Sequence, residues 1–369
     1  MATGVSTDSL GAEKKQQYSG KKLRVAFIGC GGISGTHIDA YKKMPDVEIV
    51  AGCDIVPERL SEFTKKTGAT AVYADWRELL KKEQIDAVDV CTPNGLHAPA
   101  VIDSLNAGFH AITEKPMAMT PKECQKMIDT AAKNKKKLCV GFQYRYHPTT
   151  QALARARDQG EFGDIKFIKC QALRRRGIPN WGVFGQKALQ GGGPMIDIGV
   201  HVIEMAHYFL GSPRPVAATG NTWTYMGNKP SQVVSQWPNW DYKTYTVEDL
   251  AIGHIRFENG TIMHIEASFA AHIEKDVWNF TAIGDKGGCA WDPCGIYTDR
   301  AGTMWNSSPA FTGNGQFATL FEYKLRNFVD GCLLGTPLMA PGEAGMAVQK
   351  IIDGVYRSSA ASGREVKID

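Results

Sequence analysis

The sequence predicts an α/β protein with two domains: a doubly wound parallel sheet, followed by an α+β domain with a large, mostly antiparallel, open-faced sheet. A chain of 369 residues is long enough for two domains. From residue 21 to residue 141, segments of strand character alternate with segments of helix character, which is typical of a parallel sheet. From residue 142 to residue 369, several strands follow one another without helices between them, as in an antiparallel sheet.

The composition limits the classes of function and location. The 42 basic and 38 acidic residues are nearly balanced, which gives no reason to expect a nucleic-acid partner. The nine cysteines are an odd number without a C-x-x-C pair, so we expect free thiols in a reducing compartment. Residues 1–20 are polar, lack the apolar core of a signal peptide and are expected to form a flexible tail. No later segment has the length of a membrane span, so we expect a cytoplasmic protein without a membrane partner.

The first predicted strand leads into a glycine-rich turn. Residues Val25–Gly29 are uncharged and mostly bulky, as in a strand that is buried on both faces. After the turn, apolar residues at helical spacing predict a helix over Ile33–Lys43. Glycines allow a ligand to approach the backbone, and N–H groups at the start of a helix bind a pyrophosphate. We therefore predict that the turn binds a dinucleotide through Gly29, Gly31, Gly32, Ile33 and Ser34.

A carboxylate follows the next predicted strand. The segment Val47–Cys53 has strand character and ends at Asp54, at about the 20-residue spacing at which an acid binds the 2′-hydroxyl of an adenosine ribose. The alternative is a solvated helix cap before Pro57. Strand, turn, helix and acid in this order favour the ribose contact. Because Asp54 would repel a 2′-phosphate, we predict NAD rather than NADP as the cofactor.

The remaining elements of the first domain place more polar residues at one edge of its sheet. We expect a helix over Pro57–Lys66, a strand over Ala71–Tyr73, a helix capped by Asp75, a strand over Ala87–Cys91, a helix over His97–Ala107, a strand over Phe109–Thr113, a helix from Pro121 and a strand over Lys137–Gly141. Thr92-Pro93-Asn94 and His97 follow one of these strands, and Glu114-Lys115-Pro116 follows the next. Ligands bind at the carboxyl ends of parallel strands, so these residues are candidates for the cofactor site.

The second domain is predicted from a change of rhythm after residue 141. We expect helices over Thr150–Gln159 and Met195–Leu210, strands over Ile165–Arg174, Val216–Tyr225, Leu250–Phe257, Thr261–Phe269 and Val277–Ile283, and closing helices over Ala318–Leu334 and Glu343–Ser359. Asn259-Gly260 is the favoured dipeptide of a hairpin turn. Residues 286–317 are rich in Gly, Trp, Pro and Asn, and we expect an irregular segment that covers the active site.

A third group of polar residues lies on the predicted helix Met195–Leu210, where Asp197 and His201 are four positions apart and share a face. With the earlier motifs, this pattern strongly resembles the glucose–fructose oxidoreductase / inositol dehydrogenase (Gfo/Idh/MocA) family. The matching residues are Gly29–Ser34, Thr92-Pro93-Asn94, His97, Glu114-Lys115-Pro116, Arg145, Gly193, Asp197, Gly199 and His201. The resemblance extends from Lys21 to the closing helix. It implies a Rossmann domain and an open-faced second domain of the kind that commonly mediates oligomers, and we expect a homodimer or homotetramer.

The resemblance implies that Lys115, Asp197 and His201 are the catalytic residues, and their chemistry agrees with that role. Histidine titrates near neutrality, so His201 is the expected general base in the oxidation of an alcohol. The ammonium of Lys115 would stabilise the developing alkoxide. Asp197 would orient the imidazole or accept a substrate hydroxyl. Taken singly, each residue also fits a purely structural role, the first as a surface lysine, the second as a helix cap and the third as a core histidine.

Candidate substrate residues lie beside this trio. Arg145 matches the family, whereas Arg174 and Trp181 do not mark it. Arg174 and Arg176 share one face of a strand end and Arg175 lies on the other, so the first two would either clamp an anionic group or remain solvated, and Trp181 offers a face for a sugar ring. We predict no metal site, because His201 and His207 lie six residues apart, roughly 240° around a helix.

The sequence thus predicts an NAD-dependent oxidoreductase that acts on a ring hydroxyl of a sugar, a sugar derivative or a cyclic polyol. An NAD-dependent glycoside hydrolase, which oxidises C3 transiently, eliminates the substituent and adds water, needs the same hydride site and base. The third hypothesis, a regulator that binds NAD without catalysis, does not use the trio. Net formation of NADH distinguishes the first hypothesis from the other two.

Overall fold

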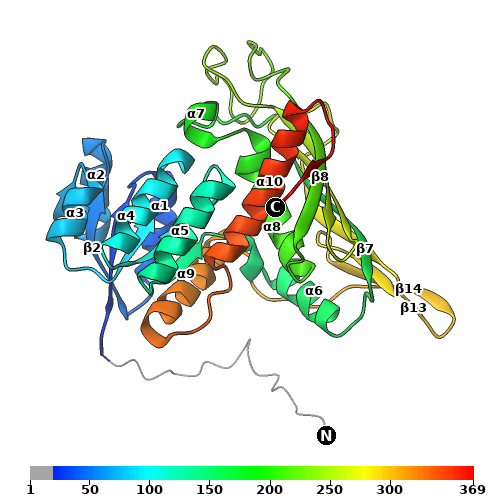
Figure 1. The fold of residues 1–369 in the computed structure, drawn as a ribbon, viewed down its shortest axis with the longest axis horizontal. Coiled ribbons are helices and arrows are strands. Elements are labelled where there is room, and N and C mark those ends of the chain that lie inside the picture. The colour runs from blue at the N-terminus through cyan, green and yellow to red at the C-terminus, as the bar shows by residue number, and fades with distance from the viewer. Residues whose placement is uncertain (1–19) are drawn as a thin grey trace, which may run out of the picture.

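The computed structural model describes residues 20–369, so the predicted tail lies, apart from Gly20, outside the described residues. Two sheets form the body of the molecule, one with six strands and one with nine. Figure 1 shows the helices of the first domain on one side and the nine-stranded sheet on the other, with α8 (Val200–Phe209) and α10 (Gly342–Ala360) between them. The predicted architecture is confirmed.

The first sheet is parallel throughout, with the strand order β3-β2-β1-β4-β5-β6. Its strands are β1 (Leu23–Ile28), β2 (Val47–Cys53), β3 (Ala71–Tyr73), β4 (Ala87–Val90), β5 (His110–Thr113) and β6 (Leu138–Val140). The order reverses at β1 and β4, which are neighbours. In doubly wound sheets a ligand binds outside the carboxyl ends of the strands at this point. The fold therefore brings the glycine turn after β1 next to the Thr92 segment after β4.

Helices connect these strands, and local sequence signals determine where they begin and end. They are α1 (Gly32–Tyr41), α2 (Pro57–Thr67), α3 (Trp76–Lys82), α4 (His97–Asn106) and α5 (Pro121–Lys133). The carboxylate of Asp75 accepts the N–H of Arg77 and begins α3. Thr120 and Glu123 form a capping box at the start of α5. Gly68 ends α2 in the left-handed conformation, with φ of 80°.

The second sheet has the order β14-β13-β12-β11-β7-β10-β9-β8-β15. Its strands are β7 (Ile165–Leu173), β8 (Pro215–Trp223), β9 (Leu250–Phe257), β10 (Ile262–Ser268), β11 (Val277–Gly284), β12 (Gly287–Ala290), β13 (Gly295–Arg300), β14 (Thr303–Ser307) and β15 (Val366–Lys367). Only the β10–β7 pair is parallel in this sheet. The predicted hairpin at Asn259-Gly260 joins β9 to β10, and Gly260 has a φ of 84°.

Residues 286–317 correct one prediction. Instead of an irregular segment over the active site, they contain β12, β13 and β14, which extend the sheet by successive hairpins. Figure 1 shows β13 and β14 at the side of the molecule away from the first domain. The sequence conceals these strands because glycines interrupt β12 and begin β13, and because most side chains of β14 are exposed. No alternation of apolar residues therefore marks them.

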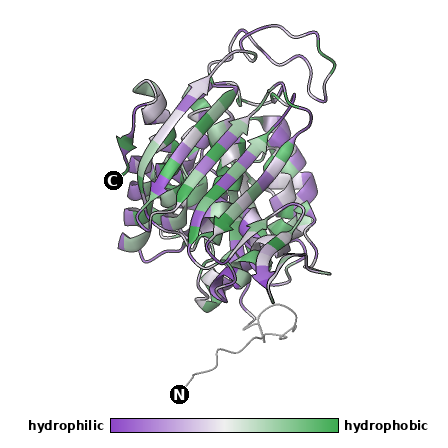
Figure 2. Cartoon of the chain, turned by 90° about the vertical axis from the view of Figure 1, so that its right-hand side faces the viewer, coloured by the Kyte–Doolittle hydropathy of each residue, from purple (hydrophilic) through white to green (hydrophobic). Residues whose placement is uncertain are grey.

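The nine-stranded sheet has two different faces. Figure 2 looks onto its open side, and hydrophobic and hydrophilic residues alternate along its strands. In β9, for example, Ile255 and Phe257 are buried, whereas His254 and Arg256 are exposed. This alternation is typical of a sheet that is covered by helices on one face only. Within residues 20–369, no helix is long and apolar enough to cross a membrane.

Helix α9 (Phe317–Leu334) belongs to the second half of the sequence but packs on the first domain. Arg326 donates to both carboxylate oxygens of Asp46, each at 2.8 Å. Glu322 pairs with Lys43, just beyond α1. The predicted second domain, residues 142–369, therefore contributes one helix to the packing of the first. This helix also brings a lysine, Lys324, into the interior near the candidate site.

Candidate functional site

The glycine turn after β1 has the geometry of a phosphate-binding turn. Gly29 has a φ of 92°, and a Cβ at this position would lie 2.6 Å from the carbonyl carbon of Cys91, so only glycine fits. A Cβ on Gly32 would meet open space. Helix α1 has no side-chain cap at Gly31, so the N–H groups of Gly32 and Ile33 are available to a ligand, whereas that of Ser34 donates to the carbonyl of Gly31. Ser34, at the third position of the fingerprint, donates its hydroxyl to the carbonyl of Gly31 at 2.6 Å.

Asp54 lies beside this turn, as predicted. One carboxylate oxygen accepts the N–H of Cys30 at 2.8 Å, and the other accepts the N–H of Val56 at 3.0 Å. The guanidinium of Arg59 approaches the carboxylate to 3.7 Å. Asp54 therefore holds the glycine turn in place through its hydrogen bond to Cys30, and its carboxylate lies at the open side of the turn. A carboxylate oxygen can accept two hydrogen bonds, and each oxygen of Asp54 accepts one from the main chain, so acceptor positions remain for a ribose hydroxyl.

These residues fit a dinucleotide on structural grounds. The hydroxyl of Thr92 is buried and has no hydrogen-bond partner within the described part of the chain. The open space over Gly32, the uncapped start of α1 and the carboxylate of Asp54 supply a cradle, N–H donors and a ribose acceptor. Gly31, Gly32, Ile33, Asp54 and Thr92 are thus the residues that would hold NAD.

His97 and Asn94 contact main-chain groups of the protein. The ring nitrogens of His97 lie 2.8 Å from the carbonyl oxygen of Pro116 and 2.9 Å from that of Thr92. Burial lowers the pKa of His97, although both carbonyls act in the opposite direction. The amide of Asn94, which follows Pro93 in a short 3-10 turn, donates to the carbonyl of Gln190 at 3.0 Å. Both ring nitrogens of His97 thus face main-chain carbonyls of the loops after β4 and β5, and a contact of His97 with the cofactor stays a prediction.

Lys115 and Asp197 meet across the two domains. The ammonium of Lys115 donates to Oδ1 of Asp197 at 2.9 Å and to its main-chain carbonyl at 2.8 Å. Both side chains are mostly covered, with exposed fractions of 17% and 13%. Lys115 follows β5, and the peptide bond to Pro116 is cis. An ammonium held in this way keeps its third proton for a ligand.

Asp197 lies in a π-helical turn, whereas the sequence predicted one continuous helix. This turn, Met195–Gly199, precedes α8, and such turns occur frequently at functional sites. The buried carboxylate of Glu248 accepts the N–H of Gly193 at 2.8 Å and that of Met195 at 3.2 Å. Burial raises the pKa of Glu248, although these bonds oppose the shift. Glu248, which sequence reasoning missed, therefore fixes the start of the segment that carries Asp197.

His201 lies one turn further, in an aromatic wall. Its ring centre is 5.2 Å from that of Tyr144 and 5.7 Å from that of Trp278. Its Nδ1 is buried without a hydrogen-bond partner among the described residues. Burial, followed by the charge of Lys115, holds the pKa of His201 well below 6.5. The imidazole is therefore neutral near pH 7, the form in which it accepts a proton.

The structure corrects the expected link between Asp197 and His201. The Asp197 carboxylate pairs with Lys115, and Nδ1 of His201 has no partner within residues 20–369, so Asp197 does not orient the imidazole through that atom. Tyr144 and Trp278, which were not predicted as site residues, pack against the ring instead. Their contribution was not visible in the sequence because both belong to segments far from His201 along the chain.

Glu114 directs its carboxylate into a group of buried polar side chains. Its carboxylate lies 3.0 Å from Nε2 of His37 and accepts the ammonium of Lys324 at 2.6 Å. The other ring nitrogen of His37 is 2.7 Å from the carboxylate of Asp89. His37, Asp89 and Lys324 are completely buried. The Glu114 carboxylate is thus part of a buried hydrogen-bonded cluster, and a contact of this residue with the cofactor stays a prediction.

The cluster includes residue types that bind metals, but their ligand atoms already contact polar groups of the protein. His37, Asp89 and Cys91 place ligand atoms within 4.8 Å of one another. The thiol of Cys91 donates to Asp89 at 3.3 Å, and the ammonium of Lys324 lies 3.1 Å from His37. A cation there would have to displace these bonds next to an ammonium group, which disfavours a metal.

The predicted substrate residues fall into two groups. Arg145 is buried, donates to Glu204 at 2.8 Å and to the carbonyl of Met339 at 2.9 Å, and so is engaged within the protein. Our proposed substrate site therefore does not include it. Arg174 and Trp181 remain, because both border Trp237. The guanidinium of Arg174 lies 4.9 Å from the Trp237 ring centre, and the ring of Trp181 lies 4.7 Å from it.

The guanidinium of Arg174, near Lys115, Asp197 and His201, has N–H groups left to donate to a ligand. One guanidinium nitrogen donates to the carbonyl of Gly177 at 3.0 Å, and no ion pair holds the group within residues 20–369. Burial lowers the pKa of Arg174, and Asp197 is the first of the charges that oppose the shift. The guanidinium thus lies within electrostatic reach of Asp197, flanked by aromatic rings.

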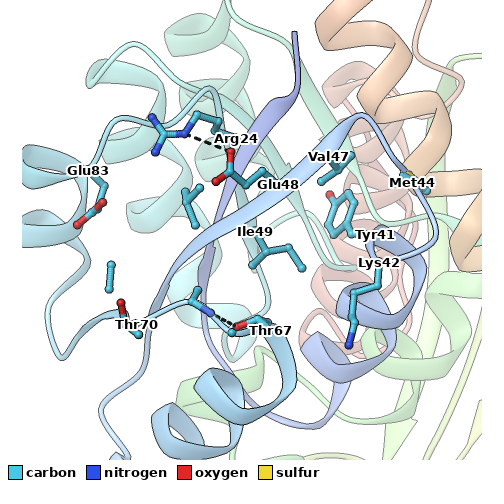
Figure 3. Close-up of a pocket in the computed structure, with 14 residues that line it drawn as sticks. Arg24, Tyr41, Lys42, Met44, Val47, Glu48, Ile49, Thr67, Thr70 and Glu83 are labelled. Carbon is cyan, nitrogen blue, oxygen red and sulfur yellow. Dashed lines mark hydrogen bonds and ion pairs between the residues drawn. The ribbon is translucent and has the colours of Figure 1, made fainter. Parts of the chain in front are cut away.

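A separate hollow of about 540 Å³ lies on the other edge of the first sheet. Figure 3 shows it between the starts of β1 and β2 and the end of α1, where Arg24 pairs with Glu48 at 3.8 Å. These strand starts are opposite the carboxyl ends that carry the glycine turn. The hollow is therefore not part of the candidate site.

Comparisons with known proteins agree with this geometry. The family model described as "Oxidoreductase family, NAD-binding Rossmann fold" matches residues 23–142, and the model "GFO/IDH/MocA C-terminal domain" matches residues 150–290. The chain is 35% identical over 367 residues to the D-glucoside 3-dehydrogenase of Escherichia coli (strain K12), covering 96% of this chain and 100% of the relative. It is 29% identical over 287 residues to the levoglucosan dehydrogenase of Pseudarthrobacter phenanthrenivorans, covering 72% and 73% of the two chains.

Solved structures have the same fold. A levoglucosan dehydrogenase in complex with NADH and L-sorbose superposes with a TM-score of 0.82 at 25% identity, covering 94% of this chain and 99% of that chain. The same enzyme in complex with NADH gives a TM-score of 0.83 at 24% identity. NAD is therefore the cofactor of the first domain. The chain belongs to the Gfo/Idh/MocA family of NAD-dependent oxidoreductases.

Proposed function

We propose that this protein is an NAD-dependent dehydrogenase that oxidises a ring hydroxyl of a sugar, with Lys115, Asp197 and His201 as its catalytic residues. The observation that carries the proposal is the ammonium of Lys115, held at 2.9 Å from Asp197 on the carboxyl edge of the parallel sheet. A neutral, buried imidazole lies in the same site. A donor and a proton acceptor beside a nicotinamide site are what alcohol oxidation requires.

Each residue has a defined part in this reaction. The Lys115 ammonium donates its remaining N–H as a hydrogen bond to the substrate oxygen and stabilises the negative charge that develops there. His201 accepts the hydroxyl proton, because its low pKa keeps the imidazole neutral near pH 7. Asp197 fixes the Lys115 side chain. Bound NAD supplies the hydride acceptor.

The substrate class follows from the relatives and from the side chains around the trio. Relatives named D-glucoside 3-dehydrogenase, levoglucosan dehydrogenase and D-apiose dehydrogenase support a carbohydrate. Arg174 and Trp181 both pack against Trp237 and would supply donors and an aromatic face, the usual means of binding hydroxyl groups and sugar rings. We propose a D-glucoside as the substrate class and its C3 hydroxyl as the position oxidised.

A second candidate is a glycoside hydrolase that oxidises the sugar only transiently. The chain is 34% identical over 152 residues, 39% of its length, to the alpha-N-acetylgalactosaminidase of Shewanella oneidensis. The relative that matches 96% of the chain is named a dehydrogenase, which favours the first proposal.

The test is a panel of sugars, glycosides and cyclic polyols with NAD, followed at the absorbance of NADH. We expect the highest kcat/KM with a D-glucoside, and NMR of the product should place the new carbonyl at C3. A preference for a cyclic polyol, or a carbonyl at another position, would contradict the proposed substrate and leave the cofactor assignment intact. A folded protein that binds NAD but oxidises no member of the panel would favour a non-catalytic regulator.

A further inference from the structure

Behind the catalytic lysine lies a buried group of four charged side chains, which we call the Glu114 cluster: His37, Asp89, Glu114 and Lys324. His37 comes from α1, Asp89 from β4, Glu114 from the end of β5 and Lys324 from α9. His37, Asp89 and Lys324 are fully buried, and Glu114 is 5% exposed. Four elements that are distant in sequence thus meet in one buried cluster, in which His37 and Lys324 contact the Glu114 carboxylate and Asp89 contacts His37.

Hydrogen bonds and opposite charges oppose the effect of burial in this cluster. Burial alone would lower the pKa of His37, but Asp89 and the hydrogen bonds to Asp89 and Glu114 raise it above 6.5. Burial alone would raise the pKa of Glu114, but Lys324 and His37 lower it well below 4.5. His37 and Lys324 therefore face the carboxylates of Asp89 and Glu114 in one buried hydrogen-bonded group. Removing one partner from such a group leaves an unpaired buried charge, so the cluster acts as a unit.

Lys324 and His37 contact the same carboxylate oxygen. Oε1 of Glu114 lies 2.6 Å from the ammonium of Lys324 and 3.0 Å from Nε2 of His37. The Lys324 ammonium also lies 4.0 Å from the centre of the Phe321 ring, one turn earlier in α9. On the other side, a Cβ at Gly141 would lie 2.6 Å from this oxygen, so the chain keeps that side free of a side chain. The Glu114 carboxylate thus has one position.

Glu114 is joined directly to Lys115, and the peptide N–H of Lys115 donates to the other oxygen of Glu114 at 3.2 Å. A fixed carboxylate therefore fixes the main chain from which the Lys115 side chain extends to Asp197. We propose that Lys324 is a positioning residue for Lys115: by binding Glu114 from α9, it holds the end of β5 so that the Lys115 ammonium stays at Asp197. This inference rests on the proposed catalytic role of Lys115.

The first test does not need turnover. In the full-length protein, the rate at which acetic anhydride acetylates Lys115 is measured by peptide mass spectrometry, relative to the exposed Lys81. Release of the ammonium from Asp197 should raise the relative rate by about fivefold or more in the Lys324→Met variant. The matched control is Glu322→Gln, which removes the exposed ion pair with Lys43 from the same helix and should leave the rate unchanged.

Lys324→Met leaves Glu114 short of one partner and destabilises the fold, so the Lys324→Met/Glu114→Gln variant is measured beside it. This variant removes one cation and one anion and keeps the His37–Asp89 pair, and melting temperatures establish that it is folded. Faster acetylation of Lys115 in the folded variants, with the control unchanged, supports the proposal. An unchanged rate in the folded variants overturns it.

Kinetics with methyl D-glucoside separate this proposal from the proposed function. We expect kcat to fall about tenfold or more, while KM for the sugar and Kd for NAD change less than about threefold, since neither ligand touches Lys324. If acetylation increases but kcat stays within about twofold of the wild type, Lys324 does position the Lys115 ammonium, and the proposed catalytic role of Lys115 is wrong.

Discussion

The ammonium of Lys115 lies 2.9 Å from Oδ1 of Asp197 and 2.8 Å from its carbonyl oxygen, and this contact joins the two domains at the candidate site. Lys115 is carried by the carboxyl end of a strand of the parallel sheet, whereas Asp197 is carried by a π-helical turn of the second domain. The position of the ammonium thus depends on both domains. An acid beside this lysine also ensures that the ammonium meets the substrate oxygen from a fixed direction.

Replacement of Lys115 by alanine should lower kcat by roughly 10²–10³, the usual effect of removing one donor to a developing oxyanion. Lys115→Arg should not restore activity, because a planar guanidinium does not fit the place of a compact ammonium that donates to two oxygens of Asp197. Steady-state kinetics at saturating NAD give the result. An alanine variant with normal kcat would remove Lys115 from the mechanism.

Replacement of His201 by alanine should abolish most turnover and leave the affinity for NAD nearly unchanged, because the residue belongs to α8 of the second domain. Isothermal titration with NAD and steady-state kinetics measure the two effects. If turnover is retained in this variant but lost in Lys115→Ala, the lysine is the base and His201 is a core histidine.

The pH dependence of kcat/KM should reflect the low pKa of His201. Burial and then the charge of Lys115 lower this pKa well below 6.5, so the imidazole stays neutral, and active, as the pH falls to that value. Activity should decline only at still lower pH, where the ring becomes protonated. An acidic limb centred above pH 6.5 would contradict this assignment.

Asp54 should determine the preference for NAD. We expect NAD to bind about tenfold tighter than NADP or more, and the Asp54→Asn variant, which removes the charge but keeps an oxygen acceptor for the Cys30 N–H, should narrow the difference. Arg59, 3.7 Å from the carboxylate, would then be free to face a 2′-phosphate. Equal affinity of the wild type for both cofactors would contradict the role of Asp54.

The open face of the nine-stranded sheet should pair with a second copy of the chain. It exposes Ile283 and Trp223, with exposed fractions of 59% and 44%, beside charged residues such as Arg256. Light scattering at micromolar concentration should give a mass of at least two chains of 40.3 kDa. A mass of one chain would contradict this prediction, and Ile283→Lys should lower the oligomer's stability.

Much of the fold followed from local sequence signals, because they suffice for a Rossmann domain. The glycine turn, Asp54 and the polar residues after β4 and β5 were all placed by the rule that parallel strands share a carboxyl edge. The strands β12–β14 were missed because glycines and exposed side chains give no apolar alternation there. The pattern of residues within a short segment indicates which face of that segment is apolar, and it does not indicate which other elements pack against it.

The site was predicted less completely, for a related reason. His37, Glu248 and Lys324 act through partners that are between 52 and 287 residues away along the chain. Nothing in the neighbouring sequence distinguishes Lys324 from the surface lysines of an amphipathic helix, and only the packing of α9 on α1 buries it. The same packing brings Lys324 to the carboxylate of Glu114.

The central claim is net oxidation of a sugar, and the balance between NADH and glycoside cleavage tests it most directly. The enzyme is incubated with methyl D-glucoside and excess NAD, NADH is followed by absorbance, and the sugar products are identified by NMR. We predict that NADH accumulates far beyond the enzyme concentration, one mole for each mole of 3-keto glucoside, without free glucose. Release of methanol and glucose at a constant, catalytic level of NADH would contradict this claim and identify a hydrolase.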